Sequence, residues 1–152
     1  MPRIRLAILT ALGALTVPAA GQACTVSATG VAFGTYDSIT AAPDDGVGSV
    51  TLICHPNVHS AVVELGAGLS GSYAPRRMRN GANTLDYNLY TSVARNIVWG
   101  NGSGGTATVT LTGGTVNSGS RTFNRTIYGR IPAGQAVAMG TYRDTIVVTI
   151  VF

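Results

Sequence analysis

The sequence closes on an alternating segment that strongly limits what the chain can fold into. From Tyr142 onward the residues alternate with a period of two, which is the pattern of a β-strand whose two faces meet different environments. The apolar members of one face are Ile146, Val148, Ile150 and Phe152. Such a strand is a hazard when its free edge faces solvent, because unpaired N–H and C=O groups recruit other strands. We therefore expect another strand, from this chain or from a partner, to cover this edge.

The rest of the chain also has the composition of β-strands, and no segment has a convincing helical period. The strand-like segments are rich in Val, Ile, Thr, Tyr and Phe, and Gly, Asn, Ser and Pro separate them. These segments are residues 24–36, 46–54, 60–68, 84–92, 96–100, 106–113, 121–131 and 140–152. Short spacings and tight turns favour an all-β antiparallel sandwich, because a parallel sheet would need helical crossovers.

Residues 1–23 have the layout of a secretory signal peptide. Two arginines precede an apolar stretch, residues 6–17, and a run of small residues follows it. We therefore predict cleavage before Cys24, which leaves residues 24–152 as one exported domain. The apolar stretch is too short for a helix that spans a membrane. An uncleaved anchor and a lipoprotein modified at Cys24 are the alternatives.

The exported part contains two cysteines, Cys24 and Cys54. In an oxidising compartment an even pair predicts a disulfide. A bond that closes a loop of about thirty residues contributes roughly 3 to 4 kcal/mol to stability in the chain-entropy model. A catalytic thiol is disfavoured, because the chain has no C-x-x-C motif.

The charge of the chain argues against nucleic acid and acidic membranes as partners. Removal of the two arginines in residues 1–23 lowers the formal net charge from +4 to +2, with histidine taken as neutral. That excess is too small to drive binding to a polyanion. A short cluster of Arg76, Arg77 and Arg79 predicts a solvated loop or sheet edge, with an anionic-ligand site as the alternative.

No set of residues indicates catalysis, a metal or another cofactor. His55 and His59 flank a turn without the further ligands that a metal site needs. The six acidic residues are dispersed, and no nucleophile and base are recognisable as a pair. The glycine-rich residues 101–105 lack the Lys-Ser/Thr and the helix of a phosphate-binding loop, so we expect a hairpin loop.

Three aromatic residues could form a platform on which a sugar ring stacks. They are Tyr87, Tyr90 and Trp99. Aromatic residues on strands more often pack in the core or against a neighbouring strand. We expect Trp99 in the core and keep all three as candidate ligand-contacting residues.

Two long blocks carry a resemblance to a known family. They read "LDYNLYTSVARNIVWGNGSGGT" in residues 85–106 and "YGRIPAGQAVAMGTYRDTIVVTIVF" in residues 128–152. Together with the two cysteines and the motif Phe33-Gly34-x-Tyr36, these blocks resemble the spore coat protein U-like domain family. Members of that family are secreted subunits of archaic chaperone-usher pili, or fimbriae. The resemblance covers the whole of the exported part.

The resemblance implies an incomplete immunoglobulin-like antiparallel β-sandwich that lacks its final strand. In the family a periplasmic chaperone lends a strand to the open groove, and an outer-membrane usher exchanges it for the N-terminal segment of the next pilus subunit. Ile146, Val148, Ile150 and Phe152 would then line the acceptor groove. The chain would pass through the periplasm to a pilus on the cell surface, where cell adhesion and biofilm formation are the implied roles.

The chain departs from the family pattern ahead of its first cysteine. Polymerising subunits carry an alternating apolar extension there, and cleavage before Cys24 would leave none, although a strand needs roughly five residues or more to fill a groove. We therefore expect a subunit that accepts a strand without donating one, at the tip or terminus of the fibre. The alternatives are a self-contained secreted β-sandwich that binds a ligand or glycan, a secreted hydrolase, and a coat-layer protein.

Overall fold

The computed structural model describes residues 3–9, 17–18 and 24–152. All regular elements in this part of the chain are strands, and it contains no helix that is long and apolar enough to cross a membrane. The strands are β1 (Arg3–Leu9), β2 (Val17–Pro18), β3 (Cys24–Ala32), β4 (Asp44–Cys54), β5 (Ser60–Leu65), β6 (Arg76–Asn80), β7 (Asn83–Tyr90), β8 (Val109–Thr112), β9 (Thr115–Asn117), β10 (Ser120–Ile131) and β11 (Thr145–Val151).

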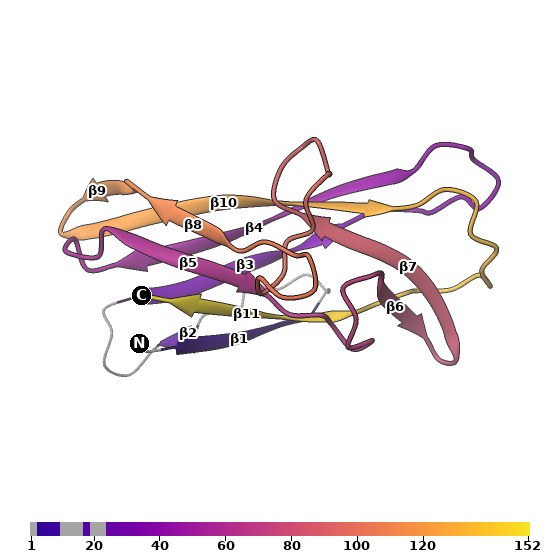
Figure 1. Cartoon of the computed structure of the whole chain (residues 1–152), viewed down its shortest axis with the longest axis horizontal. Coiled ribbons are helices and arrows are strands. Elements are labelled where there is room, and N and C mark those ends of the chain that lie inside the picture. The colour runs from indigo at the N-terminus through magenta and orange to yellow at the C-terminus, as the bar shows by residue number, and fades with distance from the viewer. Residues whose placement is uncertain (1–2, 10–16, 19–23) are drawn as a thin grey trace.

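The strands form two antiparallel sheets. A four-stranded sheet has the order β1-β11-β5-β8, and a seven-stranded sheet has the order β2-β3-β4-β10-β7-β6, with β9 paired to β10. Most strands follow the long axis of the molecule, and β7 and β6 lie toward one end (Figure 1). The structure therefore confirms the predicted all-β antiparallel sandwich.

Alternating burial along the strands builds one core between the sheets. In β5, Ala61, Val63 and Leu65 are buried, and the residues between them are only partly buried. β11 follows the same pattern, because its buried residues Val148 and Ile150 pair directly with Leu65 and Val63. Inward-facing β-branched and leucine side chains of neighbouring strands thus pack side by side, as the period of two requires.

Trp99 ties the two sheets together. Its side chain is fully buried, as the sequence analysis expected. Its backbone N–H donates to the carbonyl oxygen of Leu89 on β7 at 2.9 Å, and its indole N–H donates to the carbonyl oxygen of Val63 on β5 at 3.0 Å. One residue thus satisfies a buried aromatic donor and joins both layers.

Arg76 at the start of β6 makes a second connection between the layers. Its guanidinium donates to the carbonyl oxygens of Gly66, at 3.0 and 2.9 Å, and of Trp99, at 2.6 Å. It also donates to Oδ1 of Asn88 on β7 at 2.7 Å. These acceptors replace the water that a buried cation loses.

This burial corrects one expectation from the sequence. Arg76 was expected on a solvated loop or edge together with Arg77 and Arg79, but only the latter two are exposed. β6 alternates, with Arg76 and Met78 facing inward. The sequence did not reveal this alternation, because one of the inward residues is an arginine. The guanidinium of Arg76 also stacks over the Tyr73 ring, 4.9 Å from its centroid.

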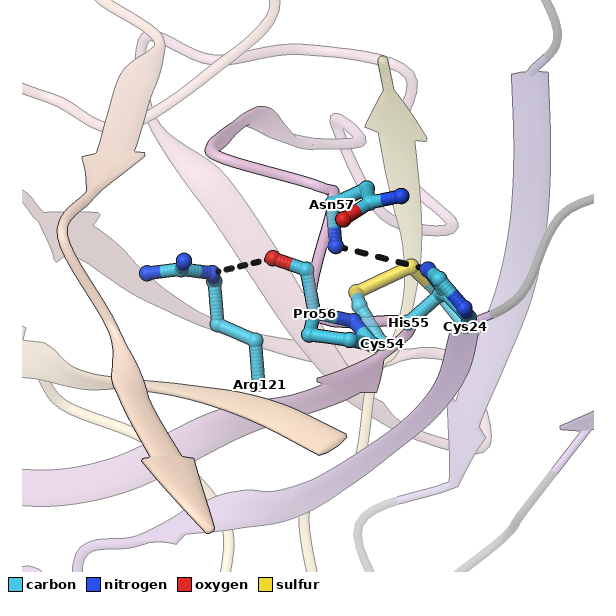
Figure 2. The surroundings of a disulfide bond; sticks show 6 residues. All are labelled: Cys24, Cys54, His55, Pro56, Asn57 and Arg121. Carbon is cyan, nitrogen blue, oxygen red and sulfur yellow. Dashed lines mark hydrogen bonds between the residues drawn. A yellow bond between two sulfur atoms is a disulfide. The ribbon is translucent and has the colours of Figure 1, made fainter. Parts of the chain in front are cut away.

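A disulfide joins Cys24, the first residue of β3, to Cys54, the last residue of β4. The two residues lie directly opposite each other in the antiparallel pair. This is the pair that the sequence analysis expected. Figure 2 shows the bond beside the loop after β4, where Nε of Arg121 on β10 donates to the carbonyl oxygen of Pro56 at 3.0 Å.

Loss of the disulfide should lower stability without changing the fold. The bond spans a sequence separation of 30 residues. In the chain-entropy model, replacing Cys24 and Cys54 together by alanine costs about 3 to 4 kcal/mol of unfolding free energy. Urea unfolding of the two proteins measures this difference. Two free thiols in the intact mass of the native, alkylated protein would contradict the pairing.

Truncation of Trp99 should be one of the costliest single changes. Trp99→Ala removes a fully buried ring and its hydrogen bond to Val63, and we expect a loss of about 3 to 5 kcal/mol in urea unfolding. Ile97→Ala is the matched control, because Ile97 lies two residues away and is half exposed. Equal losses in the two variants would show that the Trp99 ring does not support the core.

Candidate functional site

β11 has one edge that the sandwich itself does not cover. β5 pairs with one edge of β11, and among the described residues only β1 pairs with the other. That pairing is antiparallel and runs from Arg3 with Val151 to Leu9 with Thr145. β1 also contacts β3 of the opposite sheet. The cover that the sequence analysis expected for this edge thus comes from residues that it assigned to the signal peptide.

The inward face of β11 holds the residues predicted to line an acceptor groove. Ile146, Val148 and Ile150 are buried, and Phe152 packs partly buried against the same core. Val147, between two of them, is 36% exposed on the opposite face. A strand that pairs at this edge continues the sheet and so lies alongside this row of residues.

A cavity of about 830 Å³ adjoins the end of β11 where the pairing with β1 stops. Both sheets contribute apolar side chains to it, namely Val31, Leu65, Met78, Leu85, Leu89, Ile127, Ile131 and Ile146. Residues 33–39 and 137–142 complete its wall. Ile39 and Met139, which are 91% and 100% exposed, place its mouth at the surface. The cavity thus reaches from core residues of both sheets out to solvent.

Asp144 forms the polar end of this cavity, directly before β11. The side chain is buried and accepts hydrogen bonds from the N–H of Leu69, the hydroxyl of Tyr87 and the N–H of Thr145, each at 2.7 Å. A Cβ atom on Gly68 would lie 2.1 Å from Oδ2 of Asp144. The loop approaches the carboxylate so closely because glycine stands there, with a φ of +75°.

The Tyr87 hydroxyl is held in its neutral form. Burial, followed by the charge of Asp144 and the hydrogen bond to it, raises the pKa of Tyr87 well above its ordinary value of 10.0. The neutral hydroxyl stays a donor to the carboxylate. This contact fixes the start of β11 against β7 of the other sheet.

Two loops that the sequence analysis did not assign to a site meet at the cavity. The Tyr36 hydroxyl donates to the carbonyl oxygen of Pro132 at 3.1 Å and accepts from the N–H of Gln135 at 2.8 Å. Phe33 packs edge-on against Tyr87, with ring centroids 6.0 Å apart. The Phe33-Gly34-x-Tyr36 motif was the one sequence feature that pointed to these residues. Only their long-range contacts show that Phe33 and Tyr36 line a cavity.

The three candidate aromatic residues do not form one exposed platform. Trp99 lies in the core and is not part of the cavity lining, whereas Tyr87 lines the cavity with its ring largely buried. Tyr90 is half-buried and pairs with Tyr128 across β7 and β10. The structure therefore brings only Tyr87 to the candidate site.

The described residues contain no group of three or more His, Cys, Asp and Glu side chains that could hold a metal ion. Nδ1 of His55 accepts a hydrogen bond from the N–H of Asn57 in the loop after β4, at 3.4 Å (Figure 2). His59 precedes β5 in the same connection. The two histidines thus lie at a turn, apart from the cavity lining.

Comparisons with known proteins agree with this architecture. A sequence model of the Spore Coat Protein U domain matches residues 9–149. Protein U of Myxococcus xanthus is 41% identical over 133 residues, which cover 79% of this chain and 70% of that protein.

A solved structure shows the same fold. It is the chaperone-tip adhesion subunit pre-assembly complex, CsuC-CsuE, from the archaic chaperone-usher Csu pili of Acinetobacter baumannii. One of its chains matches with a TM-score of 0.56 and 23% identity, over 85% of this chain. The match spans only 39% of that solved chain, so the likeness concerns the fold of one part of it.

The buried Tyr87 hydroxyl predicts a loss of stability at alkaline pH. Its pKa in the folded chain lies above the ordinary 10.0, so its stabilising contribution is fully present below that pH and is lost as the pH rises. Between about pH 9 and pH 11, Tyr87→Phe should lose less unfolding free energy than the unchanged chain. Urea unfolding across this range measures both slopes. Identical slopes would contradict the burial of this hydroxyl.

Proposed function

The chain belongs to the Spore Coat Protein U domain family, and from this premise we propose that it is a secreted structural subunit of a chaperone-usher pilus. In this role it accepts a donated strand along the edge of β11. The observation that carries the proposal is the edge itself. The inward residues of β11 belong to the core, and β5 pairs with one edge of this strand, yet no strand from β3 to β10 pairs with the other edge.

Loss of residues 1–23 turns this edge into a binding site. Without β1, the four-stranded sheet would be reduced to β11-β5-β8, and the free N–H and C=O groups of β11 would lie above a row of core side chains. A strand added there gains main-chain hydrogen bonds and places alternate side chains inward. Ile146, Val148, Ile150 and Phe152 are the residues that we assign to the acceptor groove.

The cavity extends the same groove past the start of β11. Ile146 lines both the groove and the cavity, and Asp144 and Met78 continue the wall. A donor longer than β1 would reach this space and fill it with an apolar side chain. Filling a hollow lined by buried residues adds contacts that the core otherwise lacks, which gives the donor both affinity and register.

The proposed partners are a periplasmic chaperone, an outer-membrane usher and other pilus subunits, and the proposed location is a pilus at the cell surface. Support comes from the family and from the solved complex with the same fold, in which a chaperone is bound to a tip adhesion subunit. The predicted cleavage before Cys24 would leave no donor segment ahead of β3. This supports a position at the tip or terminus of the fibre, with adhesion as its role.

The cavity also favours a second candidate function, a self-contained secreted β-sandwich that binds a small apolar ligand or the apolar face of a sugar. Its lining is mainly apolar, and Tyr36, Tyr87 and Asp144 supply polar groups. Pockets with this mixture are typical of ligand sites. This function predicts a stable monomer that needs no strand from a partner.

Expression in a periplasm, with and without a chaperone encoded beside the chain, separates the two functions. We expect soluble protein only as a one-to-one complex on size-exclusion chromatography, because the core lacks one strand. A stable monomer with cooperative unfolding and no chaperone binding would overturn the pilus function and favour the ligand-binding one.

A matched pair of substitutions places the partner on β11. Val148→Asp introduces a charge at a fully buried position, whereas Val147→Asp introduces it at a position that is 36% exposed. We expect the first to abolish recovery of the chaperone complex and the second to retain it. Chaperone binding that survives Val148→Asp would show that the groove lies elsewhere.

A further inference from the structure

The segment that covers β11 in this structure comes from the chain's own N-terminus. We propose that residues 3–9 take the place of the donated strand in the unprocessed chain, so that removal of the N-terminal segment opens the acceptor edge. That this edge of β11 accepts a donated strand rests on the proposed function. That the edge becomes free rests on the predicted cleavage before Cys24. The pairing of β1 with β11 depends on neither.

The register of β1 matches the two faces of β11 along its whole length. Seven successive antiparallel pairs join the strands, and Figure 1 shows β1 lying along β11. The apolar residues of β1 that pair with buried residues are Ile4 with Ile150, Leu6 with Val148, and Ile8 with Ile146. Arg3 and Arg5 pair with Val151 and Thr149, which are partly exposed.

This match makes the register specific. Side chains alternate with a period of two, so a slip of one residue exchanges the two faces of a strand. After such a slip, Arg5 would pair with a residue such as Val148, whose side chain is fully buried. The alternation of arginine and apolar residues in residues 3–6 therefore favours the observed register over one shifted by a residue.

The same N-terminal segment also covers the open edge of the second sheet. β2 pairs with β3, through Val17 with Val26 and Pro18 with Thr25. Proline lacks a backbone donor and is suited to an outermost strand. β1 and β2 thus pair with the edge of β11 that faces away from β5 and the edge of β3 that faces away from β4.

The cavity lies beside the end of the pairing between β1 and β11 that the structure describes. Among the described residues this pairing runs to Leu9 with Thr145, and Thr145 follows Asp144 of the cavity wall. A donor that continues past this point would pair with the same edge and also fill the cavity. The unprocessed chain can therefore shield this edge from aggregation, and a donor that also enters the cavity gains apolar contacts there.

A cysteine pair tests the register directly in the unprocessed full chain, refolded under oxidising conditions. Ala7 lies opposite Val147 in the pairing, and Val147 is exposed enough to tolerate replacement. We expect Ala7→Cys with Val147→Cys to form a new disulfide, found by peptide mapping. Arg3→Cys with Val147→Cys, which is four residues out of register, should not. No cross-link in the first variant, or equal cross-linking in both, overturns the inference.

A second measurement tests the cover itself. Leu6→Asp places a charge opposite buried Val148, and Ala7→Asp places it opposite exposed Val147. Hydrogen exchange of the β11 amides in the full chain should be at least roughly tenfold faster in Leu6→Asp than in Ala7→Asp. Only Leu6→Asp should capture an added synthetic peptide of residues 3–9. Equal exchange and equal capture in the two variants would overturn the inference.

The outcomes also separate this inference from the proposed function. If the chain forms the chaperone complex but the variant with Ala7→Cys and Val147→Cys never cross-links, the pilus function stands and the placeholder is wrong. If the cross-link forms but no chaperone complex does, the N-terminal segment covers an edge that serves another purpose. Should Leu6→Asp fail to fold, the cysteine pair still decides the question, because neither of its substitutions introduces a charge.

Discussion

The structure depends on the edge of β11 that faces away from β5 and pairs with β1. Backbone N–H and C=O groups at a sheet edge need partners, and here they lie above core side chains such as Val148 and Ile150. Whatever strand occupies the edge therefore completes both the hydrogen bonding and the packing. β1 pairs with this edge in the present structure.

The remainder of the sandwich stays together at this edge because other contacts cross between the sheets. Trp99 hydrogen-bonds to β5 and β7, Arg76 joins β6 to the carbonyl oxygens of Gly66 and Trp99, and Asp144 receives the Tyr87 hydroxyl. Each contact satisfies a buried polar group whose loss would be costly. Together these contacts fix β5, β6, β7 and the start of β11 relative to one another.

Local patterns in the sequence predicted the architecture well and the site only in part. Alternation identified the inward row of β11, and the even pair of cysteines identified the bond between Cys24 and Cys54. Arg76 was wrongly expected in solvent, because its acceptors lie on segments far away in sequence. Tyr36 and Asp144 gave no sign of a shared cavity, since separate loops bring them there.

By itself the sequence determined the all-β class, the family and the alternating final strand, because period, composition and the spacing of motifs are written in consecutive residues. Only the tertiary structure decided that residues 3–9 pair with β11 and that a cavity adjoins Asp144, just before β11. Many apolar segments satisfy the same local pattern. Which one occupies an edge depends on register and on long-range packing, and these exist only once the two sheets have formed.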